Sequence, residues 1–185
     1  MTRPPKNFDL DCIDEPDMTQ PLDEAIRRFL CVCFPNDAEA FSRSRHWHES
    51  SPAYSLIHRD RNAIVSHTGV VVREIKCADT LITVAGIENF CVAPKLRGTG
   101  LSRHLMAAAL DETRRRGIEF GLLFCLPALE RLHASLGWIV TDQPVTTTDR
   151  TGRPQSLPAG CIAMFIELSR RPFPIGPVDL QGADW

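Results

Sequence analysis

A glycine-rich turn between an apolar strand and a helix is the stretch of this chain best suited to chemistry. The turn carries Arg97, Gly98 and Gly100, follows the apolar run 84–92, and leads into a helical pattern that extends to about Arg116. Glycines reach backbone conformations closed to other residues and leave room for a ligand. The first turn of a helix presents backbone N–H groups without helical partners, which makes an anion site. The spacing therefore predicts a site for a phosphate-bearing ligand.

Known phosphate-binding fingerprints narrow the choice of ligand. A dinucleotide fingerprint would need a third glycine where Arg103 stands, and a P-loop would need Gly-Lys-Ser/Thr, which the sequence lacks. A bare Gly-x-Gly turn also occurs in many ordinary loops, so the turn alone does not identify the ligand.

Glu88 is the candidate general base. It lies in an otherwise apolar strand, and strand alternation predicts that it points the same way as Phe90 and Val92. Burial disfavours the charged form of a carboxylate, which improves it as a base near neutral pH. The alternative interpretation is a structural carboxylate paired with a buried donor.

Periodicity and turn residues predict the elements that would position these residues. The expected helices are one that starts at Pro21 and ends before Pro35, one from Asn36 or Asp37 to about Trp47, the helix of the glycine turn, and 127–136. Runs rich in valine and isoleucine predict strands at 54–58, 63–76 and 81–92 as an antiparallel meander. Further strands are expected at 6–13, 118–125, from 138–141 and at 161–168, with a loop at 149–154 and extended coil at 171–185.

Length and composition limit the classes of protein that the chain can represent. At 185 residues and 43% hydrophobic content we expect one domain over 1–185, with its core at about 20–168 and a tail at 171–185. The 21 Lys and Arg against 23 Asp and Glu give a net charge of −2, which offers no basic footprint for nucleic acid. No apolar run is long enough to span a bilayer, so no membrane partner is expected. Seven cysteines without a signal peptide predict a reducing, cytoplasmic location.

Two short segments look like metal sites at first sight. Cys31-x-Cys33 lies in an apolar helical pattern, where buried cysteines are the more common interpretation. His46 and His48 stand two apart, and on a helix such residues point in different directions, which favours a surface segment. We therefore expect no metal.

The loop and its flanks resemble the GNAT (GCN5-related N-acetyltransferase) superfamily. Its pyrophosphate loop, Arg/Gln-x-x-Gly-x-Gly/Ala, is matched by Arg97-x-x-Gly100-x-Ser102, with serine in the last small position. A strand ending in Val92-Ala93-Pro94 precedes the loop, and Leu136-Gly137-Trp138 follows where these proteins have Gly-Phe or Gly-Trp. The resemblance covers at least 64–168. It implies a mixed α/β (α+β) fold, the GNAT acyl-CoA N-acyltransferase fold, with a central, mostly antiparallel twisted sheet flanked by helices.

Two subgroups of this superfamily share further residues with the chain. The segment 67–102 resembles the nodulation acyltransferases, which load a fatty acyl chain onto a chito-oligosaccharide and share the Gly-x-Gly-x-Ser ending. The aminoglycoside 2′-N-acetyltransferases are similar over a longer span. They share a Glu in the strand before the loop, an Ala-Ser-x-Gly-Trp as in 134–138, and a chain that ends on Trp.

The resemblance implies roles for particular residues in acyl transfer. The amide of Val92, next to Cys91, would meet the thioester carbonyl of acetyl-CoA. The pyrophosphate would bind to backbone amides of the loop, which comprises Arg97, Gly98, Thr99, Gly100, Leu101 and Ser102. Glu88 matches the acid that serves as base in many GNAT enzymes, often through a water.

His133 is the candidate for the acid that protonates the leaving thiolate. It stands where these enzymes usually have a tyrosine, and an imidazole can protonate a thiolate. A plain surface or packing histidine is the open alternative. A covalent route through Cys91 or Cys125 is disfavoured, because no base lies near them in the sequence.

Acidic residues are the candidates for binding the acceptor. Asp37 falls where the aminoglycoside enzymes carry an acceptor-binding acid, and Asp184 with the carboxylate of Trp185 would add negative charge. Together they would suit a cationic acceptor. Solvent-facing acids and a frayed tail are the open alternative.

The resemblance thus implies an acetyl-CoA-dependent N-acetyltransferase that acts directly on a primary amine of a small, cationic or amino-sugar acceptor. A longer-chain acyltransferase of the nodulation type and a catalytically silent acyl-CoA-binding module are the alternatives. The sequence leaves open whether the chain forms a homodimer.

Overall fold

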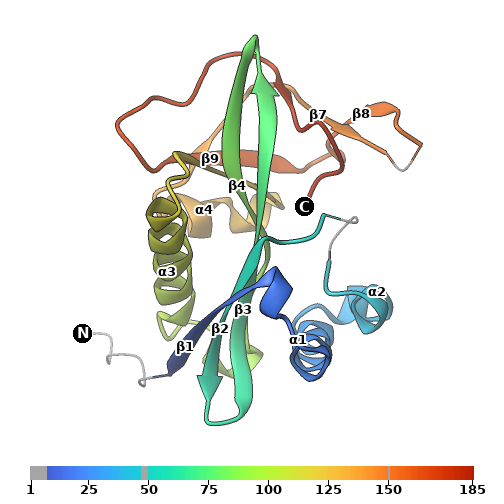
Figure 1. Cartoon of the computed structure of the whole chain (residues 1–185), viewed down its shortest axis with the longest axis vertical. Helices are drawn as coiled ribbons and strands as arrows, with labels where there is room; N and C mark the ends of the chain where they lie inside the picture. The colour runs from blue at the N-terminus through green and yellow to red at the C-terminus, as the bar shows by residue number, and fades with distance from the viewer. Residues whose placement is uncertain (1–7, 47–49, 150) are drawn as a thin grey trace. The chain divides into compact units, whose positions relative to one another are not determined.

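The computed structural model describes residues 8–46, 50–149 and 151–185 of the chain (Figure 1). Its helices are α1 (Gln20–Cys33), α2 (Ala38–Arg43), α3 (Leu101–Arg115) and α4 (Pro127–Ala134), with short 3-10 turns at Glu15–Asp17, Pro35–Asp37 and Pro94–Leu96. Its strands are β1 (Asp9–Asp14), β2 (Tyr54–Asp60), β3 (Ala63–Cys77), β4 (Thr80–Val92), β5 (Phe120–Cys125), β6 (Ile139–Val140), β7 (Val145–Thr148), β8 (Pro154–Ser156), β9 (Ile162–Glu167) and β10 (Val178–Asp179).

The chain divides into two compact units, each with its own buried side chains. Unit 1 comprises residues 1–47, 51–70 and 88–109, and unit 2 comprises 48–50, 71–87 and 110–185. The long strands β3 and β4 and the helix α3 contribute residues to both units. The prediction of one GNAT domain over 1–185 stays a prediction.

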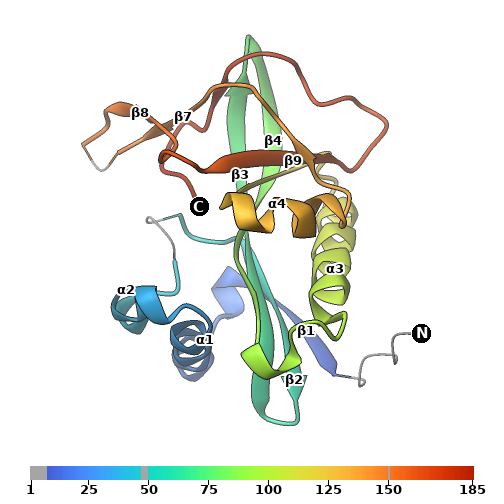
Figure 2. The same cartoon turned by 180° about the vertical axis from the view of Figure 1, so that it is seen from behind.

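Unit 1 includes β1, β2, the first part of β3 and the end of β4, together with α1, α2 and the first part of α3. β1 pairs with β2 from Asp9↔Arg59 to Asp14↔Tyr54, and β2 pairs with the first part of β3. Figure 2 shows α1 and α2 next to each other, as in Figure 1. The apolar residues of α1 recur at helical spacing and are buried, which joins the helix to the strands in one core: Ile26, Phe29, Leu30 and Cys33 with Phe41, Ile57, Cys91 and Ala93.

Unit 2 contains the first part of β4 and most of the later strands. Residues 84–87 of β4 pair in parallel with 120–123 of β5, and β5 pairs antiparallel with β9, which in turn pairs with β6. β10 pairs in parallel with β7 and antiparallel with β3, and β7 pairs with β8. The core of the unit includes Ile75, Val84, Phe120, Leu122, Phe173 and Trp185.

The predicted end of α2 is wrong. The helix stops at Arg43 rather than near Trp47, and Trp47 and His48 lie outside the described residues. Ser44 is extended, and its hydroxyl accepts a hydrogen bond from the amide of His46 at 3.0 Å. A serine that bonds the local backbone in this way competes with helix formation, which explains the early end.

The predicted extended coil at 171–185 is also wrong in part. β10 is a short strand within it, and Val178, Leu180 and Trp185 are buried. β7 and β8, on either side of the predicted 149–154 loop, were not expected either. Trp185, at the end of the tail, is only 4% exposed.

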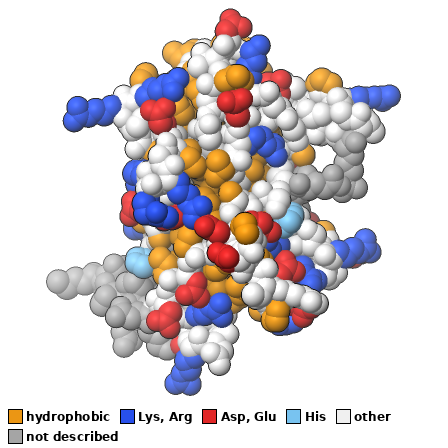
Figure 3. Space-filling view, viewed as in Figure 1, with side chains coloured by type: hydrophobic (Ala, Val, Ile, Leu, Met, Phe, Trp, Pro, Cys, Tyr) orange, Lys and Arg blue, Asp and Glu red, His pale blue; other side chains and the backbone are white. Residues whose placement is uncertain are grey.

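Charged residues of both signs are interspersed over the face of the molecule in Figure 3, in keeping with a net charge of −2. Over the described residues, no helix is both long enough and apolar enough to cross a membrane.

Candidate active site

The predicted pyrophosphate loop forms a tight turn directly before α3. Gly98 and Gly100 have φ angles of 78° and 90°, so both occupy the left-handed region that favours glycine. Both are exposed, and a Cβ at either position would find open space. The turn therefore presents its backbone to solvent, next to the N-terminal N–H groups of a 15-residue helix.

Contacts at the end of β4 join this loop to the strand. Leu101, the first residue of α3, is 1% exposed and packs against Val92 and Val65. The Arg97 side chain turns back, and its Nε donates to the carbonyl of Val92 at 3.4 Å. The loop and the end of the strand thus form one local structure in unit 1.

Glu88 lies in β4 and is 3% exposed. Its carboxylate lies directly over Gly69 of β3: a Cβ at Gly69 would come within 2.7 Å of Glu88 Oε1 and 2.9 Å of its Cγ. The Thr68 hydroxyl donates to the backbone carbonyl of Glu88 at 3.1 Å. Gly69 therefore provides the space that a buried carboxylate needs at this position.

Cross-strand pairing places Glu88 on the face of the sheet that α1 covers. Ser55 pairs with Gly69 and Ile57 pairs with His67. Paired residues, and residues two apart in a strand, share a face. Ile57 belongs to the core of α1, so Gly69 and the Glu88 carboxylate over it also face α1.

Val92 lies on the opposite face, with Leu101 of α3. The prediction that Glu88 points the same way as Val92 is therefore wrong. The reason is Asn89, whose φ of 49° interrupts the strand between them and breaks the alternation.

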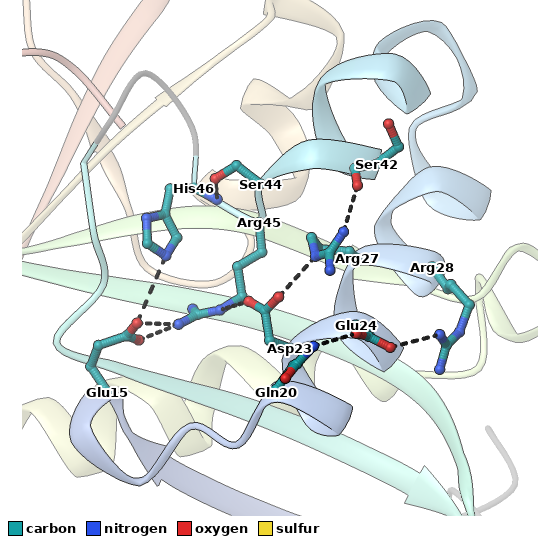
Figure 4. Close-up of polar contacts among 10 residues, drawn as sticks. All are labelled: Glu15, Gln20, Asp23, Glu24, Arg27, Arg28, Ser42, Ser44, Arg45 and His46. Carbon is teal, nitrogen blue, oxygen red and sulfur yellow. Dashed lines mark hydrogen bonds and ion pairs between the residues drawn. The ribbon is translucent and has the colours of Figure 1, made fainter.

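A buried arginine on the α1 side was not predicted. Arg45 is 2% exposed, and its guanidinium donates to Asp23 Oδ1 at 2.8 Å and to the carboxylate of Glu15 (Figure 4). Its backbone carbonyl accepts a hydrogen bond from Asn89 Nδ2 at 2.9 Å. These partners are 22, 30 and 44 residues away in the sequence, so no local spacing could have indicated them.

His67 is a second buried polar residue that sequence reasoning missed. It is 1% exposed, and its Nδ1 lies 3.2 Å from the carbonyl of Asn89. Burial lowers its pKa to about 4, so the ring is neutral at pH 7. Because a carbonyl can only accept, Nδ1 carries the proton and donates to Asn89.

The remaining predicted acids and histidines lie in different places. Asp37 is the N-cap residue of α2, half-buried, and makes no side-chain cap there. His133 is buried in α4 of unit 2, which excludes a surface role, and burial lowers its pKa. Mostly neutral at pH 7, it is a weaker acid candidate than an imidazolium would be. His46 lies 3.8 Å from Glu15, and its pKa is lowered, mainly by burial.

Cys91 and Cys125, the two cysteines considered for a covalent route, are poor nucleophiles. Burial raises the pKa of Cys91 well above its usual value and that of Cys125 to about 11. A thiol rather than a thiolate at neutral pH does not attack a thioester efficiently, which speaks against an acyl-cysteine route. In the part of the chain that the structure describes, no three His, Cys, Asp or Glu side chains are grouped as a metal site requires.

The C-terminal residues have a fixed place in unit 2. The Trp185 ring covers Gly86, packs against Phe124 with ring centroids 5.3 Å apart, and lies 5.2 Å below the guanidinium of Arg73. Arg73 also donates to the carbonyl of Ala183. Asp184, half-buried, contributes to the electrostatic surroundings of Arg73. Of the two interpretations, a frayed tail is therefore excluded.

Solved structures with the same fold are acyltransferases. A GNAT family N-acetyltransferase from Escherichia coli, solved in complex with CoA, matches with a TM-score of 0.68 at 16% identity, over 97% of this chain and 93% of that one. An acyl-CoA N-acyltransferase from Pseudomonas aeruginosa matches with a TM-score of 0.61 at 13% identity, over 86% and 99%. The predicted GNAT fold, with mixed α/β structure, is thus confirmed.

Related sequences come from both predicted subgroups. An aminoglycoside 2′-N-acetyltransferase of Mycolicibacterium fortuitum is 25% identical over 136 residues, which are 74% of this chain and 67% of the relative. A nodulation protein A of Bradyrhizobium elkanii is 30% identical over 95 residues, 51% of this chain and 45% of the relative. The chain therefore matches a little less than half the length of that relative.

A family match covers most of the chain. Residues 14–156 match the Nodulation protein A (NodA) family, and this range contains Glu88, the glycine loop and His133. The predicted resemblance to GNAT-type acyltransferases is confirmed by the family, the relatives and the solved structures together. The chain belongs to the NodA family.

Proposed function

We propose that the chain is an acyl-CoA-dependent N-acyltransferase that transfers an acetyl group directly to a primary amine of a small, cationic or amino-sugar acceptor. The amine nitrogen attacks the thioester carbon, the carbon–sulfur bond breaks, and coenzyme A leaves as a thiolate. The amine proton passes to Glu88, and the thiolate takes up a proton from water or from His133 in its predicted role as the acid. The most specific claims of this proposal are that the transferred group is acetyl and that the acceptor is a small amine.

One observation carries the proposal. A carboxylate that is 3% exposed lies one residue before the left-handed Asn89 of β4, and the same strand leads into a loop with two left-handed glycines at the start of α3. Acyl transfer needs both parts, a base for the amine and backbone donors for the pyrophosphate and the oxyanion. A module that only bound acyl-CoA would need the loop but not the buried carboxylate.

The exposed glycine loop before α3 and the end of β4 support the residues proposed to hold the donor. The amides of 97–102 would bind the pyrophosphate, and the amide of Val92 would bind the thioester carbonyl. The relative solved with CoA supports a coenzyme A donor for this fold. When bound, the coenzyme supplies an activated acyl group. The chain orients this group and provides the base.

The acceptor would lie on the α1 side of Glu88, with Asp37 as a further acid of unit 1. Asp184 and Trp185 of unit 2 are the other proposed acceptor contacts. Within unit 2 the end of the tail has a fixed place, which is compatible with a binding role, since a loose tail could not select an acceptor. The aminoglycoside relative supports a small amine as the class of acceptor.

A longer acyl donor is the second candidate, because the chain belongs to the NodA family. The experiment is a panel of amines and amino sugars assayed with acetyl-, octanoyl- and palmitoyl-CoA, in which free thiol is followed. Turnover that falls with chain length supports the acetyltransferase, and the opposite order supports the longer-chain enzyme. Binding of every donor without turnover on any amine would contradict both.

A further inference from the structure

Asn89 adopts a backbone conformation that is unusual inside a strand. Its φ is 49°, in the left-handed region, although it lies within the 13 residues of β4. Among the described residues, the other non-glycine positions with positive φ are Arg61, Ala78 and Gln181, and all three lie in turns or bends. Such conformations persist only where surrounding structure holds them, and they are frequent at functional sites.

Three hydrogen bonds hold the left-handed bend of β4 at Asn89, called the Asn89 turn below, in place. Asn89 Nδ2 donates to the carbonyl of Arg45 at 2.9 Å, and the buried His67 ring donates to the carbonyl of Asn89 at 3.2 Å. The Thr68 hydroxyl donates to the carbonyl of the preceding residue, Glu88, at 3.1 Å. Two successive carbonyls of β4 are thus bonded by side chains of β3.

The partner of the Asn89 side chain is itself fixed. Arg45 is buried and held by Asp23 and Glu15, which come from α1 and the turn before it. The hydrogen bond from Asn89 therefore ends on a residue that other ion pairs hold in place. The position of the Asn89 side chain is thus fixed by contacts outside β4 as well as by the strand itself.

The Asn89 turn lies between the two groups that are proposed to act in acyl transfer. It separates Glu88, which faces α1, from Val92, which faces α3, so the two groups proposed for acyl transfer sit on opposite faces of one strand. We propose that Asn89 is a positioning residue: its side-chain bond to Arg45 fixes the turn that sets the Glu88 carboxylate relative to the amides that follow. This inference rests on the proposed acyl transfer.

The test compares variants that separate the bond from the backbone conformation. Asn89→Gly keeps the left-handed turn without strain but removes the side-chain bond, whereas Asn89→Ala loses both. We expect kcat to fall at least about ten-fold in Asn89→Gly, with the KM for acetyl-CoA within about two-fold, because small displacements of a base lower the rate steeply. Arg61→Gly is the matched control: it relieves a φ of 57° in the β2–β3 turn and should leave kcat unchanged.

The outcomes distinguish this inference from the proposed function. A kcat of Asn89→Gly equal to that of the wild type would overturn the positioning role, even if Asn89→Ala is impaired, since conformation alone would then suffice. If the wild type turns over no amine, the proposed function fails instead. A crystal structure of Asn89→Gly then decides: a Glu88 carboxylate still over Gly69 contradicts the inference, and a displaced one supports it.

Discussion

The contact between Glu88 and Gly69 gives a direct prediction for Gly69→Ala. The new methyl group would stand 2.7 Å from Glu88 Oε1 and 2.9 Å from its Cγ, where ordinary contacts are 3.4–4 Å. Because Cγ is crowded as well as the carboxylate, turning the carboxylate about its terminal torsion cannot relieve the contact. The whole side chain must retreat by roughly 1 Å, and a misplacement of that size costs on the order of 10²-fold in rate.

The assay is steady-state kinetics with acetyl-CoA and the acceptor that the amine panel identifies. We expect kcat of Gly69→Ala to fall about 10²-fold, and the affinity for CoA to stay unchanged, because the loop 97–102 is not touched. The φ of Gly69 is not in the left-handed region, so alanine can adopt the backbone conformation, and any loss of stability comes from the contact with Glu88.

Gly121→Ala is the matched control for crowding in a strand. Its Cβ would stand 2.7 Å from Ile166 and 2.9 Å from Trp138, both in unit 2. This variant should lose stability by about 1–3 kcal/mol through overpacking while kcat stays near the wild-type value. A Gly69→Ala enzyme with kcat within about three-fold of the wild type would refute the assignment of Glu88 as a positioned base.

Four further predictions follow from other parts of the structure. Gly100→Val should abolish the thermal stabilisation by CoA, because its φ of 90° excludes a β-branched residue. Gly152→Val, at a φ of 81° in a turn of unit 2, should keep that stabilisation, and an unchanged CoA shift in Gly100→Val would contradict the loop assignment. Glu88→Gln should lower kcat by about two to four orders of magnitude with CoA affinity retained, and activity within a few-fold of the wild type would make Glu88 structural. Removal of residues 182–185 should raise the KM for the acceptor and leave the KM for CoA unchanged. Gly86→Ala should have the same effect, because its Cβ would stand 2.2 Å from the Trp185 ring. Unaltered acceptor kinetics in both variants would leave the tail without a binding role. Stability to urea should fall as the pH is lowered from 6.5 to 4, because the pKa of His67 is about 4 in the fold, below its unfolded value, and the unfolded chain binds more protons in this window. The contribution of His67 is on the order of 3 kcal/mol. An equal fall in the His67→Gln variant would assign the effect to other groups.

Patterns that lie within one stretch of sequence predicted the structure correctly. The loop could be predicted because Gly98, Gly100 and the following helix are contiguous, and glycines directly before a helix are typical of an anion-binding turn. The runs of valine and isoleucine predicted β2, β3 and β4 to within a few residues, since long strands carry many apolar positions. The burial of Glu88 followed from the same run.

Features set by distant residues could not be predicted in this way. The turn at Asn89 depends on His67 and Arg45, 22 and 44 residues away, and without it the alternation of β4 predicts the wrong face for Val92. β8 and β10 have three and two residues, too few to show a period, and β10 exists because β3 and β7 offer it hydrogen bonds.

The ion pairs of buried Arg45 with half-buried Asp23 and Glu15 have a consequence for how the sequence can change over generations. Loss of both acids would leave the buried Arg45 guanidinium without compensation and cost about 3–5 kcal/mol, whereas replacement of the whole group by apolar residues of similar volume is often neutral. We therefore expect both acids to be lost only together with Arg45, in a combined replacement of all three residues. An alignment of close descendants should show Glu15, Asp23 and Arg45 inherited together or exchanged together, even where the surrounding surface varies freely.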